Sequence, residues 1–413
     1  MPGTSKGLRH LLGFTSVAVV CLVCASPLLA IYTTVVNNGP SANRVDMVFL
    51  GDGYRAADIS TIYSAHINAM LRHFFDEGEN PFPRYRNFFN VHRIDVISNQ
   101  AGADVPPLGI YRDTALDARY YYDGVTERLL YVNESKANAA LASGLSGAGF
   151  SAEMKLITVN DTRYGGGGGA YAVYAGGNPL STEIALHELG HSFSRLADEY
   201  GGNSGTYTGA EPNEVNVTKD PTGAKWAHWL GYDQPGIGLI GAYEGGRYWD
   251  RGIYRPSLNS KMRSLNRPFD AIAREKIILD IYNYVDPLDT WTSNLATLVD
   301  PDTIMVDVVD PAVIDVQWYI DGTLLAEAAG ELFDPQAWNL PIGLHQVMAR
   351  AYDPTDWVRS NRWKLEQSVS WSVLVTVPEP HGLAGMLMGL AMLYPSGRTT
   401  GRSGVTRRDP LCP

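Results

Sequence analysis

The clearest chemical signal in the sequence is a pair of histidines four residues apart, with a glutamate directly after the first. His187, Glu188 and His191 form the pattern HELGH. On an α-helix, residues i and i+4 share one face and lie about 6 Å apart along the axis, so both imidazoles would face one point. This is the arrangement that two zinc ligands need, and it leaves positions open for water and for a further ligand. Glu188 would stand close enough to take a proton from a water molecule that the metal acidifies.

A third ligand has to come from the residues that follow, which read SFSRLADEY. In metzincins a glycine seven positions after the first histidine turns the chain, and a ligand follows three residues later. Those positions are Ser194 and Ala197 here, and alanine cannot bind a metal. We predict Asp198 as the ligand, provided that the helix ends after about Ser194 and the chain turns back. Glu199 and a carboxylate elsewhere in the chain stay alternatives, because zinc accepts either acidic side chain.

The elements that would position these residues alternate between strand and helix from residue 31 to residue 287. Segments 44–50, 88–98 and 155–160 are typical of strands, residues 56–75 of a helix, and residues 183–197 contain no proline. Interleaved strands and helices predict an α/β or α+β domain. Residues 165–169 are five consecutive glycines, which favours a mobile surface loop; a loop over a substrate cleft is the alternative.

Residues 288–376 follow a different pattern. Segments 303–309, 313–320, 345–352 and 368–375 read as strands, and Asp321-Gly322 is a hairpin-turn signal. Regular short strands predict a small β-sandwich, loosely immunoglobulin-like. No cluster of histidine or cysteine lies there, so we assign it no chemistry.

The segment HELGHSFSRLADEY resembles the active-site signature of the IgA-peptidase family of secreted bacterial zinc metallopeptidases. Further pieces are similar in the same order: RVDMVFLGDGY at 44–54, PFPRYRNFFNVHRIDVIS at 81–98, DTALDARY at 113–120 and NSKMRS at 259–264. The resemblance covers roughly residues 31–287.

This resemblance implies a metzincin-like catalytic domain that binds Zn²⁺ and hydrolyses peptide bonds. It carries His187 and His191 over as metal ligands and Glu188 as the general base. Met262 matches the methionine beneath the metal in metzincins, where a thioether offers a polarisable floor. Some metzincins use a tyrosine two residues after this methionine; Ser264 stands here, and Tyr254 is a weak candidate for that role.

Both ends of the chain carry processing signals. Residues 1–30 have a basic start, an apolar run and small residues, which predicts a secretory signal peptide. Residues 377–413 resemble a PEP-CTERM sorting signal, with Pro-Glu-Pro at 378–380, a short apolar segment at 382–394 and scattered arginines. The resemblance implies a transient membrane helix, cleavage by a sorting enzyme, and delivery to the surface of a Gram-negative-type bacterium. All three cysteines lie in these two segments, so the mature chain would contain none.

The composition fits an exported enzyme that acts on proteins. Of 413 residues 45% are hydrophobic and 19% charged, which is enough for a sizeable core, and the net charge of −11 with no basic stripe excludes nucleic acid as the expected partner. The sequence therefore predicts a secreted zinc-dependent endopeptidase with a protein or peptide substrate and no obligate oligomer. The alternative is a surface adhesion or scaffold protein that keeps a peptidase-like fold without turnover.

Overall fold

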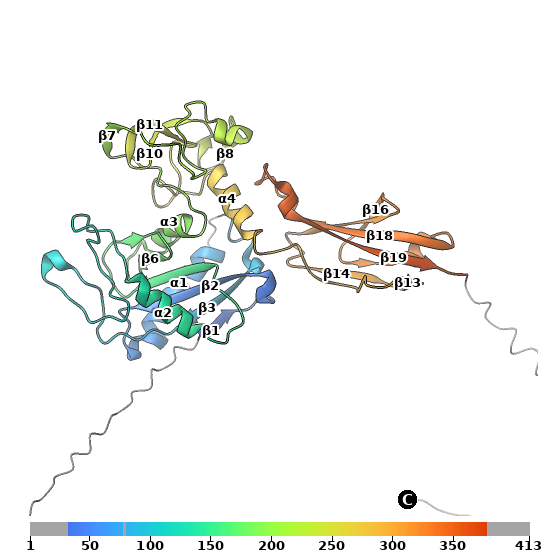
Figure 1. Ribbon diagram of the computed structural model, residues 1–413, viewed down its shortest axis with the longest axis horizontal. Coiled ribbons are helices and arrows are strands. Elements are labelled where there is room, and N and C mark those ends of the chain that lie inside the picture. Colours follow the sequence, from blue (N-terminus) through green and yellow to red (C-terminus); the bar gives the residue numbers. More distant parts are fainter. Residues whose placement is uncertain (1–31, 77–79, 378–413) are drawn as a thin grey trace, which may run out of the picture. The chain divides into compact units, whose positions relative to one another are not determined.

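A computed structural model describes residues 32–76 and 80–377 (Figure 1). The chain divides into two compact units. Within the described residues, unit 1 comprises 32–76, 80–291, 306–316 and 350–368, and unit 2 comprises 292–305, 317–349 and 369–377. The predicted signal peptide and, apart from Val377, the predicted sorting tail with its membrane segment lie outside the described residues. Among the described residues, no helix combines the length and apolar character needed to cross a membrane.

Unit 1 is built on a six-stranded sheet of order β1-β3-β2-β4-β6-β5. Strands β2, β3, β4 and β6 are parallel, and β1 and β5 pair antiparallel at the two edges. The bounds are β1 Tyr32–Val36, β2 Val45–Asp52, β3 Phe89–Ile94, β4 Met154–Val159, β5 Gly166–Gly167 and β6 Ala172–Ala175. Every residue of β2 is buried, as expected for a central parallel strand covered on both faces. The three strands predicted at 44–50, 88–98 and 155–160 are β2, β3 and β4.

Four α-helices belong to this unit: α1 Ser64–Phe75, α2 Glu134–Gly144, α3 Ser181–Ser192 and α4 Ala271–Ile281. Helix α3 packs against β6, β4, β5 and α1, whereas α2 packs against β3. The predicted helix 56–75 is divided into a 3₁₀ turn at Ala56–Asp58, a π turn at Ile59–Tyr63 and α1. Further 3₁₀ turns are Ser41–Asn43, Arg86–Phe88, Pro106–Leu108, Ala224–Trp229, Pro335–Trp338 and Arg362–Leu365.

Unit 1 also holds a smaller sheet that follows α3 in the chain. Its order is β10-β11-β7, with β7 Asn203–Thr206, β10 Tyr243–Gly246 and β11 Trp249–Arg255; β8 Asp233–Gln234 and β9 Gly238–Leu239 form a separate pair. Arg247 and Tyr248 connect β10 to β11, and both have positive φ, 48° and 70°. A two-residue hairpin turn that matches the right-handed twist of its strands requires positive φ at both residues. Residues other than glycine, asparagine and aspartate adopt that conformation only at an energetic cost.

The later part of the chain is almost entirely β-structure. One sheet has the order β12-β14-β17 and the other β13-β19-β18-β15-β16. The strands are β12 Leu288–Trp291, β13 Leu298–Val299, β14 Ile304–Val308, β15 Asp315–Ile320, β16 Thr323–Ala329, β17 Leu332–Phe333, β18 Gly343–Tyr352 and β19 Glu366–Val375. Asp321 and Gly322 connect β15 to β16 with φ of 47° and 80°, so the predicted hairpin is confirmed. In unit 2 the buried Trp318 stacks on Phe333 and Trp371, with ring centroids 4.9 and 5.8 Å apart.

Two expectations about this architecture have clear outcomes. The mixed α/β class is confirmed, with several sheets and few helices. The glycine run is not the mobile surface loop that its composition favoured, because Gly165, Gly166 and Gly167 are buried and the last two form β5.

Candidate functional site

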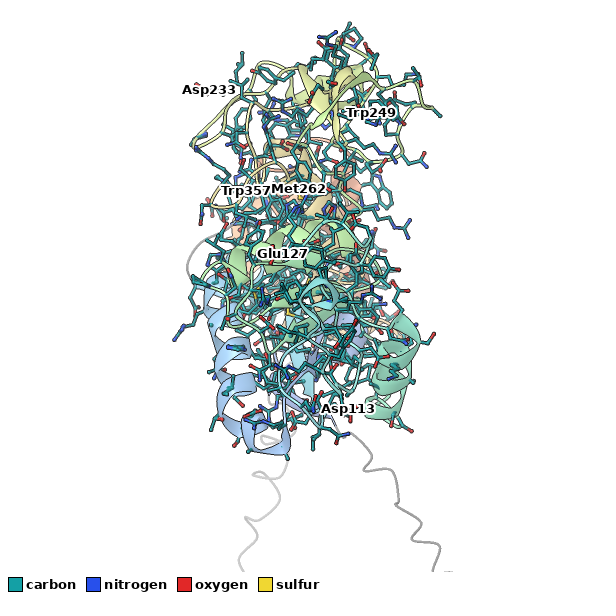
Figure 2. All side chains as sticks on the ribbon, turned by 90° about the vertical axis from the view of Figure 1, so that its left-hand side faces the viewer. Asp113, Glu127, Asp233, Trp249, Met262 and Trp357 are labelled. Carbon is teal, nitrogen blue, oxygen red and sulfur yellow. The ribbon has the colours of Figure 1, made fainter. Side chains whose placement is uncertain are left out.

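Helix α3 carries the HELGH pattern across the surface of the central sheet. Ile184, Leu186 and Leu189 are buried on its inner side, while His187 and His191 stay partly exposed one turn apart. Gly190 lies on the side of the helix that meets Met262, where an added Cβ would come 2.6 Å from the methionine sulfur. The absence of a side chain therefore lets the fully buried Met262, labelled in Figure 2, reach the helix at Gly190.

Three side-chain atoms converge beside this helix. The His187 and His191 Nε2 atoms lie 3.2 Å apart, and Asp198 Oδ1 lies 3.1 Å from the first and 3.3 Å from the second. Ligand atoms about 2.0–2.1 Å from a tetrahedral zinc lie about 3.4 Å from one another. The three atoms thus have nearly the spacing of three corners of such a site. Among the described residues, His187, Glu188 and His191 also form the group able to hold a metal ion by proximity alone.

Backbone carbonyls fix the orientation of both imidazoles. His187 Nδ1 lies 3.0 Å from the Lys261 oxygen, and His191 Nδ1 lies 2.6 Å from the Leu196 oxygen. A carbonyl only accepts, so each neutral ring carries its proton on Nδ1 and directs the Nε2 lone pair toward the other ring and Asp198. Asp198 Oδ1 is itself buried and has no hydrogen-bond donor among the described residues. Three lone pairs facing one point repel one another unless a cation lies between them, so these residues fit a metal ion.

Asp198 reaches this point because the helix ends early and the chain reverses. Helix α3 stops at Ser192, the Arg195 and Leu196 N–H groups donate to the His191 and Gly190 carbonyls, and Arg195 has φ 53°. The left-handed residue is therefore the eighth after His187, and Asp198 follows it by three. The three-residue interval that metzincins have between turn and ligand separates Arg195 from Asp198 here, displaced by one residue, with an arginine taking the conformation usually left to glycine.

Glu199, the alternative ligand, points elsewhere. Its carboxyl accepts hydrogen bonds from Asn216 Nδ2 at 2.9 Å and Ser260 Oγ at 2.6 Å, and its own N–H donates to the Met262 carbonyl at 2.8 Å. The side chain is fully buried, and burial raises its pKa well above the usual range. Glu199 therefore ties the chain after α3 to the segment around Met262, while its neighbour Asp198 faces the histidines.

Glu188 lies beside the two histidines and against the glycine run. It is 8% exposed, and burial raises its pKa, an effect that His187 and His191 partly oppose. An added Cβ on Gly166 would come 2.8 Å from Glu188 Oε1, and one on Gly168 would come 2.6 Å from His191 Cβ and 3.0 Å from Glu188 Oε2. The glycines thus allow backbone to cover the carboxylate closely, which spacing in the sequence did not predict.

Tyr248 is a residue of this site that the sequence did not single out. Its hydroxyl donates a hydrogen bond to Asp198 Oδ2, and its N–H donates to the Tyr200 carbonyl at 2.9 Å. Burial, together with the Asp198 carboxylate, raises the pKa of Tyr248 far above its usual range, so the hydroxyl keeps its proton at neutral pH. Tyr254, the weak candidate, pairs through its backbone with Thr218 in the smaller sheet. Only the β10–β11 turn, fifty residues after Asp198, brings Tyr248 here.

A buried ion pair holds the segment whose carbonyl orients His187. Lys261, whose carbonyl faces His187, bonds through Nζ to Glu183 Oε2, and the other oxygen of Glu183 lies 2.9 Å from His73 Nε2. The carboxyl of Glu183 is largely buried; burial alone would raise its pKa, but His73 and Lys261 lower it to about 2. This cluster joins α1, α3 and the segment that precedes Met262.

Two hollows have His187 and Glu188 in their lining. One, of about 220 Å³, is lined by Tyr131, Gly166–Gly169, Asp198 and Tyr248. The other, of about 210 Å³, is lined by Arg128, Tyr164, Ile184, Arg263 and Leu265. There is thus open space beside both residues.

Comparison with known proteins gives the class of protein to which this site belongs. Residues 33–238 match the family model described as IgA peptidase M64. The chain belongs to this peptidase family, as the motifs from residue 44 onward predicted. The match includes His187, Glu188, His191 and Asp198 and ends before Tyr248. No curated protein matches the chain.

Proposed function

We propose that this peptidase is a secreted zinc-dependent endopeptidase in which His187, His191 and Asp198 hold the metal and Glu188 is the general base. The observation that carries the proposal is the triangle of two Nε2 atoms and one carboxylate oxygen, 3.1–3.3 Å on a side, with no donor to Asp198 Oδ1 among the described residues. Two histidines and one carboxylate are a ligand set of catalytic zinc sites. When bound, the metal would acidify water and polarise the scissile carbonyl.

Glu188 supplies the proton transfers. Its carboxylate takes a proton from the attacking water and passes it to the nitrogen of the departing amine. Burial raises its pKa, which brings its basicity closer to that needed near neutral pH. The glycine run excludes bulk water from one side of the carboxylate, since Gly166 and Gly168 approach both of its oxygens.

Tyr248 stabilises the negative charge that develops on the carbonyl oxygen. Its hydroxyl is protonated and held at Asp198, from which a small rotation would redirect it toward substrate in the adjoining hollow. A donor that meets the charge only as it develops stabilises the transition state more than the ground state.

The fold-level part of the proposal is a metzincin-like domain followed by an immunoglobulin-like sandwich. A helix with two histidine ligands, a left-handed turn three residues before a third ligand, and a buried methionine beneath them support the first part. The stacking of Trp318 on Phe333 and Trp371, which brings together strands of two sheets, supports the second. Export by the leader and surface sorting by residues 377–413 complete the proposal. A chain ending before Val377 should then be secreted without surface retention.

Glu188→Gln tests the proposal. The variant keeps the metal-binding side chains and the size of residue 188 but loses the base, so we expect one equivalent of bound zinc and a rate of casein or peptide-library cleavage lowered at least about a thousandfold. Wild-type protein should lose activity with a chelator and regain it with zinc. A zinc-loaded wild-type chain that cleaves neither substrate would instead favour the idle scaffold, and near-normal activity of the variant would remove Glu188 from its role.

A further inference from the structure

We propose that the hollow of about 210 Å³ beside His187 and Glu188 is a subsite for a carboxylate of the substrate, bound by Arg128 and Arg263. This inference rests on the proposed peptidase function and names the chemistry of the residue next to the scissile bond. The carboxylate belongs either to an aspartate or glutamate side chain or to the free C-terminus of a peptide.

The two arginines come from separate parts of the chain and line the same hollow. Arg128 lies in the irregular segment that precedes α2. Its carbonyl accepts a hydrogen bond from the Gly166 N–H at 3.1 Å. Arg263 directly follows the buried Met262, and its Nη1 donates to the Glu199 carbonyl at 3.3 Å. Both contacts belong to the structure that builds the site: Gly166 holds the Arg128 backbone, and the Glu199 carbonyl holds the Arg263 guanidinium.

Neither arginine is neutralised in the part of the chain that the structure describes. Arg128 donates to the Tyr200 hydroxyl at 3.2 Å and stacks over that ring at 5.5 Å, and no carboxylate pairs with it or with Arg263. Other arginines of this acidic chain do have such partners, among them Arg44 with Asp289 and Arg84 with Asp353. Both guanidinium groups line one polar hollow and keep N–H donors that make no hydrogen bond to a carboxylate of the described residues. An anion can therefore bind between them.

The remaining lining suits a short acidic side chain. Ile184 and Leu265 offer apolar contacts for one or two methylene groups, and Tyr164 adds a hydroxyl. Glu188 is the acidic group that faces the hollow, and Asp198 lies beyond it; both carry negative charge that the two arginines oppose. Because His187 and Glu188 line the hollow too, a carboxylate bound there belongs to a residue beside the reacting bond.

The test compares matched peptides cleaved by the zinc-loaded enzyme. Once a cleaved sequence is known, each position flanking the cut is made Glu or Gln, and the C-terminus is made a free acid or an amide. We expect kcat/KM to favour Glu over Gln at one flanking position by roughly tenfold to a hundredfold, the range of a hydrogen-bonded charge pair. A preference confined to the free C-terminal acid also supports the carboxylate subsite and assigns its source.

Arginine variants separate the subsite from a general effect on the fold. In Arg128→Gln and Arg263→Gln the Glu-to-Gln selectivity ratio should fall toward one, and Arg263→Glu should shift preference toward Lys at the same position. The exposed Arg267, outside the hollow, gives the control Arg267→Gln, which should keep the ratio. Binding of the Glu peptide to zinc-loaded Glu188→Gln, followed by fluorescence anisotropy, gives a readout independent of turnover.

The outcomes distinguish the two proposals. An enzyme that cleaves peptides with no preference for either carboxylate, or keeps its preference in both arginine variants, overturns the subsite and leaves the peptidase function standing. A zinc-loaded chain that cleaves nothing, yet binds the Glu peptide through the arginines, overturns the function and keeps the carboxylate site.

Discussion

At the scale of single residues, the site depends on the directions in which two adjacent acidic side chains, Asp198 and Glu199, point. Asp198 faces the histidine nitrogens, whereas Glu199 lies in the core between Asn216 and Ser260. Burial penalises the charged form of both. At Asp198 the facing imidazoles, when protonated, outweigh burial and lower the pKa, whereas at Glu199 burial dominates and raises the pKa. One acid is thus suited to bind a cation and the other to remain protonated.

Asp198→Ala should weaken zinc binding by roughly a hundredfold or more, because it removes one of the three proposed protein ligands. Glu199→Gln keeps a neutral amide in the same hydrogen-bonding position and should change zinc affinity by less than about threefold. Competition with a chromophoric chelator measures both, on protein whose folding is checked by circular dichroism. Equal affinities in the two variants would contradict the assignment of Asp198.

Tyr248→Phe should lower kcat/KM by about ten- to a thousandfold, the range for removing one transition-state donor. The phenyl ring fills the same space, so zinc content and the melting temperature should stay close to wild type. Tyr254→Phe, on the neighbouring strand, is the control. Full activity of Tyr248→Phe would mean that its hydroxyl only braces Asp198 in the absence of substrate.

At the scale of elements, α3 is positioned by what packs around it. The edge strand β5 lies over Glu188, Met262 lies under Gly190, and the Lys261–Glu183 pair holds the segment that orients His187. Two of these contacts need a glycine, in β5 and at position 190, and the third needs a buried charged pair. The geometry of the site is therefore sensitive to small substitutions outside the proposed metal ligands.

Gly168→Ala should reduce activity at least tenfold, because its Cβ would meet His191 Cβ at 2.6 Å and Glu188 Oε2 at 3.0 Å. The adjacent Gly169→Ala would have only Glu134 Oε1 within 4 Å, at 3.9 Å, and should stay within about twofold of wild type. Steady-state kinetics on the pair checks the claim. Equal activity of the two alanine variants would contradict the prediction that the backbone must approach Glu188 closely at Gly168.

Glu183 predicts an acid-dependent loss of stability. Its folded pKa of about 2 lies below the ordinary glutamate value of 4.5, so its stabilisation is present above about pH 4.5 and is lost as pH falls toward 2. Linkage makes this at most about 3 kcal/mol. Glu183→Gln should be less stable near pH 6 and show a flatter decline between pH 5 and 2 in urea titrations. A parallel decline in both proteins would contradict the assignment.

At the scale of the whole molecule, residues beyond 287 contribute to unit 1. Asp353 is fully buried there and accepts hydrogen bonds from Arg84 at 2.7 Å, Tyr85 at 2.6 Å and Tyr282 at 3.0 Å. Glu275 of α4 accepts from the Arg359 and Ser360 N–H groups at 2.6 and 2.8 Å. The catalytic part of the chain thus includes a late segment that returns to it.

A chain ending at residue 287 should therefore be markedly less stable than one ending at 377. Truncation leaves the Arg84 guanidinium and two buried tyrosine hydroxyls without their acceptor, which costs several kcal/mol and lowers the melting temperature by roughly 10 °C or more. Asp353→Ala in the longer chain should reproduce part of the loss. An equally stable 31–287 fragment would show instead that the catalytic domain ends where the sequence pattern changes.

The sequence by itself determined the chemistry that depends on local spacing. HELGH on one helix sets two histidines and a glutamate on one face, parallel strands appear as apolar runs, and Asp321-Gly322 marks its hairpin, because each signal lies within a few residues. Only the tertiary structure decided which acid faces the histidines, why five glycines follow one another, and that Tyr248, Arg128 and Arg263 surround Glu188. These depend on a left-handed Arg195, a strained hairpin turn and backbone packing between segments distant in sequence, and no local pattern encodes such contacts.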